Sequence, residues 1–101
     1  MNYKKKIVKI ANDILQDRLG LIEGSRKLAE FQSISELENN KDILFFVGID
    51  SETDYLPVGV VRKKWSKSAL MEKDIEIEEI ENFYRKKVEV ACRRLINNLE
   101  K

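Results

Sequence analysis

Three carboxylates that alternate along the chain are its strongest candidates for a reactive or binding site. Asp50, Glu52 and Asp54 directly follow the apolar run 43–49. Carboxylates with this alternation open calcium-binding loops, in which they direct their oxygens to one centre. The central glycine and the last glutamate of such a loop are both missing. We therefore expect the three side chains to cap backbone amides at a turn and to face a partner rather than to hold a metal ion.

The composition argues against an enzyme. The chain has no histidine, which is the commonest general base and a common zinc ligand. Its single cysteine, Cys92, lies among the apolar positions Val88 and Leu95, and a cysteine in that setting is more often a small buried hydrophobe than a nucleophile. We predict no catalytic residues, no metal site and no cofactor. A metal-dependent enzyme built on Asp50 and Asp54 is the least favoured alternative.

Basic residues beside an aromatic ring suggest a second class of function. Arg62, Lys63 and Lys64 precede Trp65, and the basic run 85–87 offers a further patch. Such groups neutralise phosphates and stack on bases. An acidic run at 72–81 lies between the two patches in the sequence, and its charge repels the phosphate backbone that the patches would bind. Nucleic-acid binding through Arg62–Lys64 and Arg85–Lys87 is therefore the alternative function, and a solvated charged face with a packed Trp65 is preferred.

Length and charge limit the architecture and the partners. The chain has 101 residues, which suffice for one domain, 1–101, with one modest core. Hydrophobic residues make up 43%, so a folded core is expected, and charged residues make up 37%, so the surface is densely charged. The 19 basic and 18 acidic residues nearly cancel, which leaves no overall field for nucleic acid or an anionic membrane. With one cysteine and no long apolar stretch, we predict a cytoplasmic protein without a membrane span.

The carboxy-terminal third predicts a single long helix. Apolar residues recur there at steps of three and four, and no glycine or proline interrupts the sequence from about residue 66 to the end. The recurring positions are Ile77, Ile80, Tyr84, Val88, Ala91, Leu95 and Leu99. The charges of this helix are separated, because its first half is acidic and its second half is basic.

The first half of the chain is also helical in pattern. A helix is predicted over about 3–18, with Gly20 as its stop signal, since glycine readily adopts the left-handed conformation that closes a helix. A second helix should begin at Leu21. Its interior contains Gly24 and Ser25, whose small size permits the close approach of another backbone.

The central apolar run 43–49 is the ambiguous element. We favour a helix that begins at Asp42 and breaks between Gly48 and Asp50. The alternative is a two-stranded ribbon at 43–62, which would give an α+β fold, although its second strand would contain Pro57. The predicted fold is therefore all-α, a mainly helical single domain of four to five helices with a long C-terminal helix.

One block of the sequence resembles a known group of proteins. Residues 47–59 read Val-Gly-Ile-Asp-Ser-Glu-Thr-Asp-Tyr-Leu-Pro-Val-Gly, and Arg62 and Trp65 follow. This block resembles small bacterial proteins of uncharacterised function. The resemblance implies a bacterial, single-domain protein, and it carries over no catalytic residue or cofactor.

We favour a non-catalytic protein-binding module. The chain is small, it lacks the usual catalytic residues, and its acidic and basic residues are separated along the sequence. In one specific version, the protein acts like an immunity protein and neutralises a toxin through an acidic surface. The partner-binding candidates are Asp50, Glu52, Asp54, Glu76, Glu78 and Glu79. A homodimer through the long helix is also compatible with the pattern.

Overall fold

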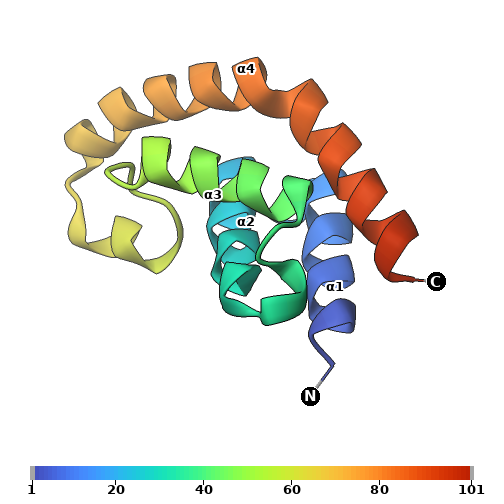
Figure 1. The fold of residues 1–101 in the computed structure, drawn as a ribbon. Helices are drawn as coiled ribbons and strands as arrows, with labels where there is room; N and C mark the ends of the chain where they lie inside the picture. Colours follow the sequence, from blue (N-terminus) through green and yellow to red (C-terminus); the bar gives the residue numbers. More distant parts are fainter. Residues whose placement is uncertain (1, 101) are drawn as a thin grey trace.

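The computed structural model describes residues 2–100, and every regular element in that range is a helix (Figure 1). The α-helices are α1 (Tyr3–Leu15), α2 (Leu21–Ala29), α3 (Lys41–Thr53) and α4 (Lys67–Leu99). The 3-10 helices are η1 (Glu30–Ser33), η2 (Ser35–Leu37) and η3 (Gly59–Lys64). The predicted all-α fold with a long C-terminal helix is confirmed. The alternative ribbon at 43–62 is wrong, because α3 and η3 occupy that segment.

Helix α1 ends earlier than the sequence predicts, and a different residue ends it. The last helical residue is Leu15 rather than residue 18, and Asp17 adopts the left-handed conformation with φ 57°. The backbone amides of Arg18 and Leu19 then donate to the Asp13 carbonyl at 2.9 and 3.1 Å. Gly20 has an ordinary φ of −62° and precedes α2 as its N-cap. The prediction that Gly20 ends the first helix is therefore wrong.

Helix α2 packs against α1 at a glycine. Gly24 is buried, and a β-carbon added to it would lie 2.5 Å from the Ile14 Cδ1 and Cγ1 atoms. The next residue, Ser25, is also buried, and its hydroxyl donates to the Leu21 carbonyl at 2.7 Å. Another segment does come close to Gly24, but the nearest atoms belong to the Ile14 side chain, so the predicted approach of another backbone is not seen there.

Helix α3 runs through the glycine that was expected to break it. Its N-cap is Asn40, whose side chain accepts from the amides of Asp42 and Ile43 at 2.9 and 3.0 Å. The helix then continues past Gly48 to Thr53, so the predicted break is wrong. Glycine within a helix costs only about 1 kcal/mol relative to alanine. Packing offsets that cost, because the later residues Ile49 and Thr53 are buried in the core.

Helix α4 spans the whole molecule and arches over α1 and α3 (Figure 1). At 1.5 Å per residue, a straight helix of 33 residues would be about 50 Å long. The longest dimension of the molecule is 45 Å. The helix bends with its convex side toward solvent, as long surface helices commonly do. The predicted long helix is confirmed up to Leu99, and its last predicted residue, Lys101, lies outside the described residues.

The core lies between these helices, with α2 packed along α3 and α1 packed along α4. Its fully or nearly fully buried apolar side chains include Ile7, Ala11, Ile14, Ile22, Leu28, Ile43, Phe46, Ile49, Leu56, Val88, Ala91, Cys92 and Leu95. From the apolar stripe predicted for α4, Val88, Ala91 and Leu95 are buried and the other positions pack partly buried against this core. One face of α4 is thus committed to the fold, and the opposite face is open to solvent.

Candidate protein-binding surfaces

The three alternating carboxylates do not converge, because they lie on a helix and at its end. Asp50 and Glu52 belong to α3, and Asp54 is the C-cap of that helix. Successive helical residues turn by about 100°, so Glu52 points away from its two neighbours in the pattern. Within residues 2–100, no three Cys, Asp and Glu side chains form a group that could hold a metal ion. No backbone amide in the described part of the chain donates to any of the three carboxylates, so the predicted capping role is not seen.

Asp50 instead lies beside an arginine that closes the end of α3. The Arg26 Nε atom is 3.7 Å from Asp50 Oδ1. Its Nη2 atom donates to the carbonyls of Thr53 and Leu56, the latter at 2.9 Å. The Thr53 carbonyl, at the last residue of the helix, also accepts the Leu56 amide at 3.0 Å. A cation near a helix C-terminus suits the helix dipole. Sequence reasoning missed Arg26, because its hydrogen-bond acceptors are backbone carbonyls that no side-chain pattern reveals.

Two tyrosines bind two of the predicted acidic residues. The Tyr84 hydroxyl donates to Glu52, and the Tyr55 hydroxyl donates to Glu76. Each hydrogen bond to a carboxylate stabilises the neutral phenol and so raises the pKa of that tyrosine. The contacts join α3 and the loop after it to the first half and the middle of α4. Glu52 and Glu76 are therefore partly engaged within the molecule.

The remaining predicted acidic residues face solvent. Asp54, Glu78 and Glu79 are exposed. Among the ion pairs formed within residues 2–100, none involves these three side chains. They lie at the end of α3 and in the first half of α4, where a partner can reach them.

The predicted basic patch is also partly engaged. Arg62 donates to both oxygens of Asp74 at 2.7 and 3.0 Å and to the Pro57 carbonyl at 3.1 Å. The Asp74 contact raises the pKa of Arg62 and lowers that of Asp74. Lys63, Lys64 and Trp65 are exposed. The other basic run, 85–87, lies roughly 25 Å further along α4, so the two patches do not form one surface.

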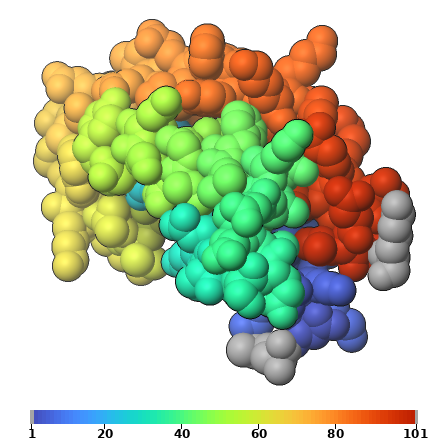
Figure 2. All heavy atoms as spheres, in the orientation of Figure 1, coloured from blue at the N-terminus to red at the C-terminus, as the bar shows by residue number. Residues whose placement is uncertain are grey.

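A groove between α3 and α4 combines apolar and cationic side chains. Its volume is about 470 Å³, and it lies where the two helices border each other in the space-filling view, α3 in green and α4 in orange (Figure 2). The residues along it are Lys41, Asp42, Phe45, Phe83, Lys86, Lys87, Val90, Ala91 and Arg94. Phe83 is 74% exposed and Val90 is 50% exposed, so apolar surface in the groove is open to solvent.

The groove carries a net positive charge. Its only acidic residue, Asp42, is buried and accepts three hydrogen bonds from Arg94 at 2.6, 3.0 and 3.1 Å. Within residues 2–100, the other cations, Lys41, Lys86 and Lys87, take part in no ion pair. The groove therefore offers exposed aromatic and aliphatic surface beside three ammonium groups with unused charge.

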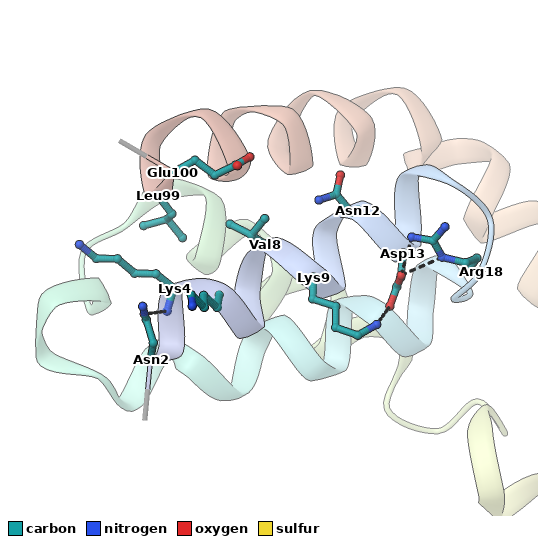
Figure 3. Close-up of a pocket in the computed structure, with 10 residues that line it drawn as sticks. Asn2, Lys4, Val8, Lys9, Asn12, Asp13, Arg18, Leu99 and Glu100 are labelled. Atoms are coloured by element: carbon teal, nitrogen blue, oxygen red, sulfur yellow. Dashed lines mark hydrogen bonds and ion pairs between the residues drawn. The ribbon is translucent and has the colours of Figure 1, made fainter.

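A second hollow lies between α1 and the end of α4 (Figure 3). Its volume is about 620 Å³, and three of its charged side chains, Lys9, Asp13 and Arg18, pair with one another. Figure 3 shows Lys9 and Arg18 both directed at Asp13, with the Lys9 Nζ and Arg18 Nε atoms 2.9 and 3.0 Å from its carboxylate oxygens. These contacts lower the Asp13 pKa. The hollow offers less apolar surface than the groove, chiefly Val8 and Leu99.

Cys92 is part of the core rather than of either surface. Its side chain is fully buried, and burial, assisted by the Asp42 charge, raises the pKa of the thiol to about 12. A thiol with that pKa holds almost no thiolate near neutral pH. The prediction that Cys92 is a small buried hydrophobe is confirmed.

The helices and the comparisons with other proteins add two findings. None of the helices described above combines the length and the apolar character that a membrane crossing requires. The chain was also compared with models of protein families, with curated proteins and with solved structures, and nothing matched. The resemblance of block 47–59 to small bacterial proteins stays a prediction.

Proposed function

We propose that this protein is a non-catalytic protein-binding module and that the groove between α3 and α4 is its principal binding site. The observation that supports the proposal is the combination found there. Exposed Phe83 and Val90 lie beside Lys41, Lys86 and Lys87, which have no anionic partner within the described part of the chain. An apolar anchor surrounded by charge is typical of recognition sites on proteins.

The partner that fits this site is an acidic segment with a bulky apolar side chain. The apolar side chain would cover Phe83 and Val90 and remove their surface from water, which stabilises the complex by about 25 cal/mol per Å². Carboxylates on either side of it would meet the lysines. Such charge complementarity mainly accelerates association and selects the partner, so the affinity should fall as the salt concentration rises.

A synthetic peptide tests the groove directly. The probe is a fluorescent helical peptide with a central Trp-Leu pair between glutamates, and its binding is followed by fluorescence anisotropy. We expect Phe83→Ala and Lys87→Glu each to weaken binding at least about tenfold, a loss of roughly 1.4 kcal/mol. A peptide with lysines in place of the glutamates should not bind.

Matched variants outside the groove control for general effects. Val60→Ala removes an exposed apolar side chain from η3, where Val60 is 78% exposed. Lys5→Glu makes the same charge change on α1. Both should leave peptide binding unchanged. Peptide affinities that do not respond to Phe83→Ala and Lys87→Glu would overturn the groove as the site.

The acidic surface is a second candidate for the same class of function. Asp54, Glu78 and Glu79 are exposed, and their charges have no cationic partner within residues 2–100. This supports the immunity-like version, in which the surface covers a basic active site of a toxin. The triple change of Glu76, Glu78 and Glu79 to lysine should abolish capture of a basic nuclease offered as bait. Unchanged capture of the nuclease would remove this version.

The nucleic-acid alternative makes a different prediction. In that case the protein should bind short DNA through Lys63, Lys64 and Trp65.

A further inference from the structure

The outer face of α4 carries apolar side chains that nothing in the fold covers. Met71 is 70% exposed, Ile75 is 64% exposed and Val90 is 50% exposed. These three belong to one exposed stripe, in which each member lies three, four or seven residues from another. The charged members of the stripe are Glu72, Glu79, Lys86 and Arg93. The stripe lies opposite the buried side of the helix, where Val88, Ala91 and Leu95 face the core. All its members are exposed.

Charge along this stripe changes sign at the middle of the helix. The acidic members Glu72 and Glu79 precede the midpoint, and the basic members Lys86 and Arg93 follow it. If two copies of α4 lie antiparallel, with the two-fold axis between positions 82 and 83, residues at equal distances from the axis face each other. Glu79 then meets Lys86, Glu72 meets Arg93 and Ile75 meets Val90. A parallel pair would bring like charges together instead.

We infer that the outer face of α4 binds α4 of a second copy of this chain in an antiparallel, two-fold symmetric dimer. The face is complementary to itself, which is the condition that a two-fold interface imposes. Ile75 and Val90 supply apolar contact, and the Glu79–Lys86 pair forms twice, once on each side of the axis. This interface adjoins the proposed binding groove, because Lys86 and Val90 border both surfaces and Phe83 lies next to the two-fold axis.

The curvature of α4 limits the size of this interface. Figure 1 shows the helix bowed away from the body, so two such arches touch at their centres and diverge toward their ends. Contact over residues 75–90 covers roughly 22 Å of helix. A helix pair in contact over that length buries less surface than the roughly 1,200–2,000 Å² of a standard stable interface. The dimer should therefore dissociate on dilution through the micromolar range.

Complementary charge reversals test both the dimer and its register. Glu79→Lys places lysine against Lys86 in a homodimer, and Lys86→Glu places glutamate against Glu79. In sedimentation velocity over a concentration series, each variant alone should dimerise at least about tenfold more weakly than the natural chain. An equimolar mixture of the two should dimerise again, because every facing pair is then of opposite sign.

A second mixture separates specific contact from general attraction. Glu79→Lys mixed with Lys27→Glu has the same net charges, but Lys27 lies on α2, so one of the two facing pairs stays repulsive. It should associate less than the complementary mixture. Circular dichroism checks that each variant is folded. The dimer would be overturned if the natural chain stays monomeric at millimolar concentration. It would also be overturned if the complementary mixture dimerises no more strongly than the control mixture. Neither result would affect the peptide test of the groove.

Discussion

Arg94 holds Asp42 from 52 positions away in the sequence, and this pair joins the start of α3 to the last third of α4. The Nε and Nη2 atoms both donate to the carboxylate, and Nη2 lies 2.6 Å from Oδ1. The contact raises the pKa of Arg94. Because the Asp42 side chain is only 7% exposed, the arginine supplies the charge and hydrogen bonds that water cannot.

Removal of Arg94 should destabilise the fold, because Asp42 would stay buried without its partner. We expect Arg94→Ala to lower the urea midpoint clearly. Arg94→Lys should restore only part of the loss, since an ammonium group cannot reproduce the two-nitrogen contact. The neighbouring Arg93→Ala is the control and should have almost no effect, because Arg93 is exposed and takes part in no ion pair within residues 2–100. Equal midpoints for the two alanine variants would contradict this role of Arg94.

Two glycines in helices should respond to alanine with opposite signs. At Gly48 a β-carbon would have no neighbouring atom within 4 Å, so Gly48→Ala should stabilise α3 by up to about 1 kcal/mol through helix propensity. At Gly24 the same methyl group would lie 2.5 Å from Ile14, so Gly24→Ala should destabilise the protein by about 1–3 kcal/mol through overpacking. Urea unfolding of both variants measures the difference. Two shifts of the same sign would contradict the packing described for Gly24.

These positions also show how far the sequence predicts the structure. The long helix was predictable, because apolar residues recur with a helical period over 77–99 and no glycine or proline interrupts the sequence after about residue 66. The end of α3 was not predictable. The free energy that one glycine costs a helix is smaller than the free energy gained when Ile49 and Thr53 are buried. The groove was missed as well. Its side chains come from 41–45 and 83–94, and only packing brings those segments together.

Asp17 is the one residue other than glycine with a positive φ in the described part of the chain. A side chain in the left-handed conformation carries a steric cost that glycine avoids, so Asp17→Gly should raise the free energy of unfolding by about 0.5–1 kcal/mol. Gly20→Ala is the matched control. Gly20 has a φ of −62°, and its added methyl would lie 3.7 Å from Glu81 Oε2, so this change should be nearly neutral. A large loss of stability on Gly20→Ala, with no gain of stability on Asp17→Gly, would mean that Gly20 rather than Asp17 is the left-handed residue of this turn.

The buried thiol of Cys92 should make the protein less stable in alkali. Its pKa is about 12 in the folded chain, compared with an ordinary value of 9.0. The unfolded chain therefore releases this proton at lower pH than the folded chain does. The stability that this thiol contributes is complete below about pH 9 and is lost as the pH rises toward about 12, with a slope of at most about 1.4 kcal/mol per pH unit.

Comparison with Cys92→Ala isolates this contribution from other groups. Tyr55 and Tyr84 also have a raised pKa and act in the same direction above about pH 10, but they titrate in both proteins. The alanine variant should be less stable than the natural chain at about pH 8, because a small cavity replaces the sulfur. That deficit should shrink steadily between about pH 9 and about pH 10.5 in urea unfolding experiments. A deficit that stays constant over this range would mean that Cys92 titrates normally in the folded chain and is accessible to water.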